Sequence, residues 1–112
     1  MSRASTYDEV AAHLAAKTPF THPTCSGYVV EQGRPGGFPY GESDDEHAAQ
    51  IVDLANAAAE EGRVYVLVSY STPVAFMGGG NAVLTAGKYS ATTSKHLGLF
   101  KDAFPYAVVA GE

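Results

Sequence analysis

Two stretches of the chain have the apolar spacing of amphipathic helices, with apolar residues three or four positions apart on one predicted face. The first begins at a capping box formed by Thr6 and Glu9 and ends before Pro19, because proline disfavours helical geometry in the residue before it. The second begins at the capping box of Ser43 and Glu46. We therefore expect two main helices, at about residues 6–17 and 43–61.

The apolar segments elsewhere are mostly β-branched or aromatic, which is typical of strands. Residues 64–71 form the strongest candidate, and because both faces of this segment are largely apolar we expect it to be a central strand. Pro73 has no N–H to donate, so it marks a bend, a bulge or an edge. The further strand candidates are residues 27–32, 74–77, 82–86 with a continuation at 88–91, and 106–109.

A third, shorter helix is predicted before Pro105, with Thr93 or Ser94 as its cap. Together the elements predict a fold of the α+β class, in which a small, mostly antiparallel sheet of about four or five strands packs against the two main helices and a short C-terminal helix. We expect a single domain over residues 1–112, with residues 1–4 and 110–112 flexible.

The composition narrows the cellular setting of this domain. Cys25 is the only cysteine, so no intramolecular disulfide can form and a disulfide-rich secreted scaffold is excluded. No apolar run approaches the roughly 20 residues needed to cross a bilayer, and the first residues lack the apolar stretch of a signal peptide. We expect a cytoplasmic protein without a membrane partner.

The net charge of −5 is unevenly distributed along the chain. Residues 1–62 carry −7 and residues 63–112 carry +2, with no carboxylate between Glu61 and Asp102. An acidic chain does not suit a general nucleic-acid coat protein. The basic C-terminal half nevertheless leaves a nucleic-acid or phosphate ligand open.

Hydroxyl-bearing side chains gather in two segments, residues 69–73 and 88–96. Because the first precedes one strand of a predicted hairpin and the second follows its partner, we expect both at the same end of the sheet. Free N–H groups at the start of the last helix, with Lys95 and His96, would suit a phosphate or carboxylate. The same hydroxyls would equally cap the helix and satisfy backbone groups. The candidate binding residues are Tyr70, Ser71, Thr72, Tyr89, Ser90, Thr92, Thr93, Ser94, Lys95 and His96.

The motif Ser-Tyr-Ser-Thr-Pro-Val-Ala at residues 69–75, followed by Lys-Tyr-Ser-Ala-Thr-Thr-Ser-Lys-His at 88–96, resembles a known module. It is similar to a domain of unknown function in small proteins of actinobacterial phages and their hosts, and the resemblance covers about residues 63–97. What it implies is an origin in a phage or an actinobacterium. It implies no activity.

Patterns for metal binding and catalysis are weak in this sequence. His22 and Cys25 have a ligand-like spacing, but a zinc site usually needs four ligands. The remaining histidines are scattered through the chain: His13, His47 and His96. We expect no metal, no cofactor and no assigned catalytic residue.

Three function classes remain, in this order. The first is a protein-interaction module that modulates a host factor, favoured by the small size and by Phe38 and Tyr40 in a Pro/Gly-rich loop. Homo-oligomerisation through residues 106–109 is a further option. The second is a binder of nucleic acid or a phosphate ligand. The third is a small enzyme with His96 as its base, for which the hydroxyl segments supply no carboxylate partner.

Overall fold

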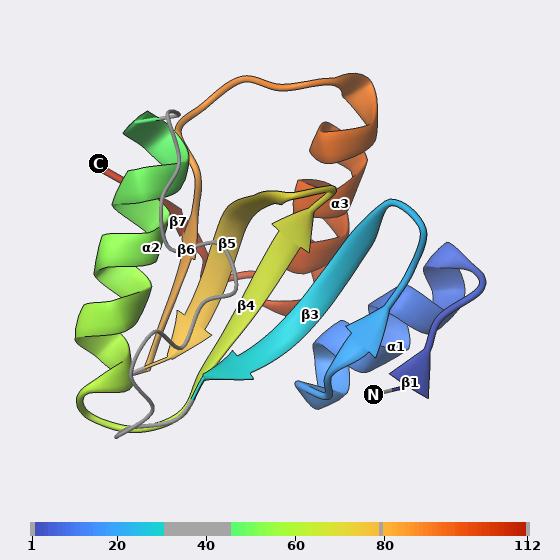
Figure 1. The fold of residues 1–112 in the computed structure, drawn as a ribbon, viewed down its shortest axis with the longest axis horizontal. Coiled ribbons are helices and arrows are strands. Elements are labelled where there is room, and N and C mark those ends of the chain that lie inside the picture. The colour runs from blue at the N-terminus through green and yellow to red at the C-terminus, as the bar shows by residue number, and fades with distance from the viewer. Residues whose placement is uncertain (1, 31–45, 79, 112) are drawn as a thin grey trace.

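Every residue of strand β4 (Val64–Ser69) is buried, and the other elements are arranged around it. The computed structural model describes residues 2–30, 46–78 and 80–111, and its sheet has seven strands in chain order (Figure 1). The strands are β1 (Ser2–Arg3), β2 (Phe20–Thr21), β3 (Cys25–Val30), β4, β5 (Thr72–Gly78), β6 (Asn81–Leu84) and β7 (Val108–Val109). The central position predicted for residues 64–71 is confirmed.

The predicted sheet of about four or five mostly antiparallel strands is wrong, although the fold is of the α+β class. The described residues form a seven-stranded mixed sheet, in which β1 pairs parallel with β2 and β7 pairs parallel with β6. Strands β1, β2 and β7 have two residues each, so no alternation can be read from them. Both parallel pairs are joined through a helix, as a parallel connection requires.

The three helices of the described chain are α1 (Tyr7–Ala16), α2 (Glu46–Ala59) and α3 (Ala91–Ala103). The Thr6 cap of α1 is confirmed, since its hydroxyl accepts from the Glu9 N–H. The C-terminal helix predicted as short has 13 residues, and its cap is Ser90 rather than Thr93 or Ser94. The predicted strand continuation at 88–91 is therefore wrong, because the chain already turns into the helix there. The predicted start of the second helix at Ser43 lies outside the described residues.

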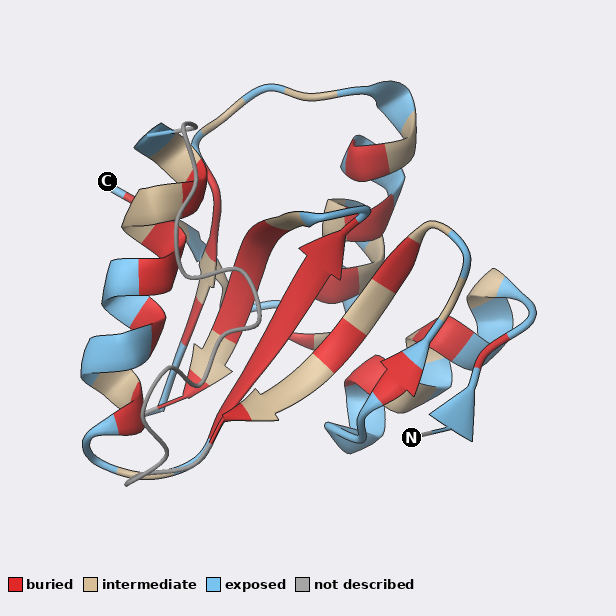
Figure 2. Cartoon of the chain, in the orientation of Figure 1, coloured by how far each residue is buried: buried red, intermediate tan, exposed pale blue. Residues whose placement is uncertain are grey.

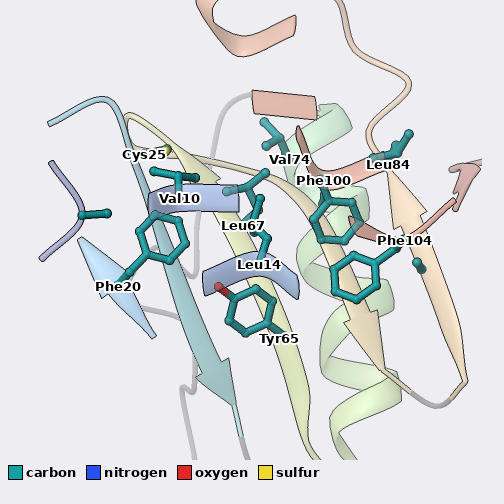
Figure 3. Packing of buried hydrophobic residues seen from close by; sticks show 13 residues of the cluster. Val10, Leu14, Phe20, Cys25, Tyr65, Leu67, Val74, Leu84, Phe100 and Phe104 are labelled. Atoms are coloured by element: carbon teal, nitrogen blue, oxygen red, sulfur yellow. The ribbon is translucent and has the colours of Figure 1, made fainter. Parts of the chain in front are cut away.

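The helices cover both faces of the sheet, α2 one face and α1 with α3 the other (Figure 1). Alternate side chains of β4 serve the two cores: Tyr65 and Leu67 pack with α1 and α3, whereas Val64, Val66 and Val68 pack with α2. Figure 2 shows β4 buried along its whole length. In Figure 3, side chains of α1 and α3 meet those of β4 in the first of these cores.

Two sequence expectations about single segments can be compared with the structure. The register between β4 and β5 shifts between Leu67 and Val68, where Pro73 opposes Val68, so the predicted irregularity at Pro73 is confirmed. We expected both ends of the chain to be flexible. Within the described residues, β1 pairs with β2, and Ala4 and Ala110 are buried.

Two glycines should respond in opposite ways to substitution by alanine. A Cβ at Gly27 would collide with the Tyr65 hydroxyl and the Phe20 ring in the core, so Gly27→Ala is expected to cost about 1–3 kcal/mol of unfolding free energy. A Cβ at Gly98 in α3 would meet open space, so Gly98→Ala is expected to add about 0.5–1 kcal/mol. Urea unfolding of both variants checks this, and a destabilised Gly98→Ala would contradict the described surface of α3.

Candidate functional site

A buried histidine, His96, joins elements that are far apart in the sequence. Its side chain comes from α3 and is 1% exposed. Its Nδ1 lies 2.8 Å from Oγ of Ser69 at the end of β4, and its Nε2 lies 3.0 Å from Oγ1 of Thr24 between β2 and β3. The Tyr7 hydroxyl of α1 lies 3.4 Å from the same Nε2. His96 is thus the common hydrogen-bond partner of three other parts of the fold.

One backbone group fixes the direction of these bonds. The Thr24 N–H donates to Nδ1 of His22 over 3.1 Å, so this nitrogen is an acceptor. The Thr24 hydroxyl, 2.9 Å from the same nitrogen, must therefore donate to it. Having used its one proton, Thr24 Oγ1 accepts from Nε2–H of His96. It also accepts from the Tyr7 hydroxyl over 3.0 Å.

The direction carries through His96 to the start of α3. With its proton on Nε2, neutral His96 accepts at Nδ1, so Ser69 donates to it. Ser69 then accepts from Thr93 over 2.9 Å, and Thr93 accepts from Ser90 over 3.4 Å. The result is a one-directional chain of hydrogen bonds from Ser90 to His22, in which neighbouring bonds polarise one another. We call these residues, with Tyr7, the His96 network.

The surroundings of His96 favour its neutral form. Burial is the largest effect and lowers the pKa of His96 from its ordinary value of 6.5, and the basic side chains of His22 and Lys95 lower it further. Burial also raises the pKa of the Cys25 thiol to about 11, and its side-chain hydrogen bond with Thr24 offsets this in part. At neutral pH, His96 is therefore uncharged and the Cys25 thiol keeps its proton.

The network fits a structural role better than catalysis. Ser69 is only 2% exposed, so the hydroxyl bonded to His96 cannot reach a substrate. No carboxylate of the described residues takes part in the network, and its buried hydroxyl and imidazole groups all have partners. A satisfied buried network of this kind fixes the relative positions of the elements that supply it.

The structure brings together some of the predicted binding residues. Ser90, Thr93 and His96 belong to the network, Lys95 Nζ lies 4.6 Å from the centre of the Tyr7 ring, and the Tyr70 ring lies 6.2 Å from that of His96. Tyr89 packs partly buried against the core. Among the described residues, no side-chain hydrogen bond joins the remaining four to the network: Ser71, Thr72, Thr92 and Ser94.

The sequence did not predict that His22, Thr24 and Tyr7 contribute to this end of the sheet. The available signal is the segment 22–25, whose polar side chains and proline are typical of a turn and whose His22 and Cys25 have a ligand-like spacing. In the structure Cys25 faces the core, and within the described ranges no three His, Cys, Asp or Glu side chains form a group that could hold a metal ion.

A second feature, on the other side of the fold, is apolar. Leu54 of α2 and Val108 of β7 are 40% and 55% exposed, and they line a groove of about 360 Å³ between α2 and the sheet, together with Ala57, Ala58, Phe76 and Val83. Tyr106, just before β7, is 53% exposed, but its ring lies edge-on to Phe104 of the other core, with centroids 6.3 Å apart. We call Leu54, Val108 and this groove the β7 surface. The aromatic residues singled out in the sequence, Phe38 and Tyr40, lie outside the described residues.

Comparison with known proteins gives one result. A model described as a family of unknown function (DUF8033) matches residues 43–107. The chain belongs to this family. The match spans α2, β4, β5, β6 and α3, and so includes Ser69, Thr93 and His96 but not Tyr7 or Thr24. No curated protein and no solved structure matches the chain.

The resemblance to a domain of unknown function is confirmed at this level, since residues 63–97 lie within the matched segment. The family membership brings with it no substrate, cofactor or partner. Of the helices in the described part of the chain, none is long and apolar enough to cross a membrane.

The buried His96 should make the stability of the domain depend on pH. In the unfolded chain His96 has the ordinary histidine pKa of 6.5, whereas in the folded protein its pKa is lower. The contribution of neutral His96 is therefore complete above about pH 6.5 and decreases as the pH falls towards the lowered value. Urea unfolding between about pH 7.5 and pH 5 should show this loss. His96→Gln should have a lower unfolding free energy than the wild type at pH 7.5 and should lose less of it on acidification. If the variant and the wild type lose the same amount, other groups cause the pH dependence.

Tyr70 occupies a backbone conformation that favours glycine. It has φ of 55° in the two-residue turn between Ser69 and Thr72, and its side chain is 54% exposed. Tyr70→Gly is therefore expected to raise the unfolding free energy by about 1 kcal/mol. The neighbouring variant Ser71→Gly, where φ is not positive, should be neutral or destabilising. Thermal unfolding of the two variants checks this prediction. If Tyr70→Gly is less stable than the wild type, the contacts of the tyrosine ring stabilise the fold by more than the backbone strain at residue 70 destabilises it.

Proposed function

We propose that this domain is a protein-interaction module that binds its partner through the β7 surface. The observation that carries the proposal is the apolar groove there, which two exposed apolar side chains line. Of the four large hydrophobic side chains that are exposed in the described residues, these two are Leu54 and Val108. Single exposed apolar residues are ordinary, whereas a contiguous group beside a groove is typical of protein-binding sites.

The β7 edge of the sheet also has backbone groups that a partner could bind. Strand β7 ends the sheet of the described residues, and the N–H of Ala110, the residue after it, donates inward to Leu84 O over 2.8 Å. Because inward and outward groups alternate along a strand, the N–H and C=O of Val109 point away from β6. An extended segment of a partner could add to this edge while its side chains enter the groove, as in other recognition by strand addition.

The partner we infer is a host protein. The inference is supported by the resemblance of residues 63–97 to modules of actinobacterial phages and their hosts. Glu61 and Asn81 at the groove supply a polar rim around the apolar centre, as protein interfaces usually have. A second copy of the chain is the alternative occupant, and light scattering of the purified chain distinguishes it from a host protein.

Replacing Val108 by aspartate should abolish the interaction without unfolding the domain. The full chain, tagged, is used to capture proteins from an actinobacterial lysate treated with nuclease, and the affinity of the captured protein is then measured with purified components. We expect Val108→Asp and Leu54→Asp each to weaken binding at least about tenfold, because a buried unpaired charge opposes an apolar interface.

The matched control is Tyr70→Asp, which introduces the same charge at an exposed aromatic residue outside the β7 surface. It should bind normally, and thermal unfolding should show all variants folded. Light scattering of the purified chain tests self-association, which Val108→Asp would also prevent. A partner that binds Val108→Asp as tightly as the wild type would refute the proposed surface.

A further inference from the structure

We propose that a hollow on the α1 and α3 face of the sheet binds a small apolar carboxylic acid, with Lys17 as the partner of its carboxylate. The hollow has a volume of about 290 Å³, and its lining includes Lys17, Val29, Arg63, Tyr65 and Met77. The groove of the β7 surface lies on the other face, beside α2. The proposal therefore uses different side chains and does not depend on the protein-interaction function.

The floor of the hollow is a row of apolar side chains that crosses three strands. Val29 of β3 is the register partner of Tyr65 of β4, and Tyr65 is the register partner of Met77 of β5. Partners of this kind project from the same face of a sheet, and all three side chains pack with the core under α1 and α3. Val29 and Met77 are only partly buried, so the helices leave part of this row uncovered.

The row lies near the end of the sheet at which β4 begins and β3 and β5 end (Figure 1). Lys17 reaches this end because it follows the last residue of α1, where its backbone N–H bonds to His13 O and Leu14 O. Its Nζ lies 5.9 Å from the centre of the buried Phe104 ring. The fold thus holds a lysine ammonium group beside the apolar floor.

The charge beside the floor is positive. Arg63, immediately before β4, is the second basic side chain that lines the hollow. Among the described residues, no carboxylate forms an ion pair with Lys17. An anion bound in the hollow would therefore meet a positive group that has no acidic partner of its own in this part of the chain.

The apolar floor and the charge together determine the class of ligand. A wholly apolar ligand would displace water from the Lys17 ammonium group and leave the charge without a partner, which costs free energy. A ligand with an apolar body and one anionic group instead buries its body on the floor and places its anion beside Lys17. A carboxylate suits this position better than a phosphate, because one charge costs less to bring beside apolar residues than the two that a phosphate can carry.

The volume of the hollow limits the size of the apolar body. At about 290 Å³ it lies at the lower end of the range of roughly 300–1,000 Å³ that is usual for ligand pockets. It therefore suits an acid with a single ring or a short chain. We choose 4-phenylbutyrate as the probe because it has one ring, a short linker and one carboxylate.

Titration of the ¹⁵N-labelled full chain with 4-phenylbutyrate, at fixed pH and ionic strength, tests the site. We expect saturable shifts of the backbone amides of Val29, Met77 and Gly78, with a dissociation constant on the order of 1 mM. Two further probes separate the two parts of the ligand. The uncharged 4-phenylbutanamide should bind at least about fivefold more weakly, and acetate, which lacks the apolar body, should not saturate in the same range.

Lys17→Glu should bind 4-phenylbutyrate at least about tenfold more weakly, whereas Lys17→Arg should keep binding. The matched control is Lys88→Glu, which makes the same charge change at an exposed lysine between β6 and α3, outside the lining of the hollow. It should bind within about twofold of the wild type, and the spectra should show all variants folded.

Three results would overturn the proposal. Equal weakening by Lys17→Glu and Lys88→Glu would show a nonspecific effect of net charge. Equal affinity for 4-phenylbutyrate and its amide, or for acetate, would show that the charge or the apolar floor has no part in binding. Absence of saturable shifts in the folded wild type would mean that the hollow binds no acid of this class.

Discussion

The burial of β4 on both faces is the constraint on which the remaining structure depends. A strand that is apolar throughout cannot leave either face in water, so each face needs its own layer of helix. Helix α2 supplies one layer and α1 with α3 the other. Helices α1 and α3 are also the crossovers of the two parallel pairs, because α1 lies between β1 and β2 in the chain and α3 between β6 and β7.

The same arrangement buries polar side chains at one end of the sheet, where β4 ends. Ser69, Thr93 and His96 are polar and buried there, and buried polar groups destabilise a fold unless they are hydrogen-bonded. A single backbone N–H, that of Thr24, sets the direction of every bond in the resulting network.

The sequence predicted those parts of the fold that produce a long local pattern. The cap at Thr6, the central strand and the irregularity at Pro73 were predictable because each depends on neighbouring residues. Strands of two residues have no period to detect, and they form only because a helix returns the chain to the sheet edge. The cap of α3 was misplaced because four hydroxyl residues between 90 and 94 could each have served, and only packing selects Ser90. The involvement of His22 and Thr24 with His96 depends on contacts more than 70 residues apart in sequence, which no local pattern encodes.

The segment that matches the family model is not a complete folding unit, because it lacks β3. Residues 43–107 contain β4 but not β3, which pairs with it along its full length, nor Val10, Leu14 and Phe20 of the same core. Excised alone, that segment would turn its most apolar strand into an open edge, the arrangement that most readily joins other chains into aggregates. A relative built only from the matched segment would need another strand beside β4, from its own flanking sequence or from a second molecule.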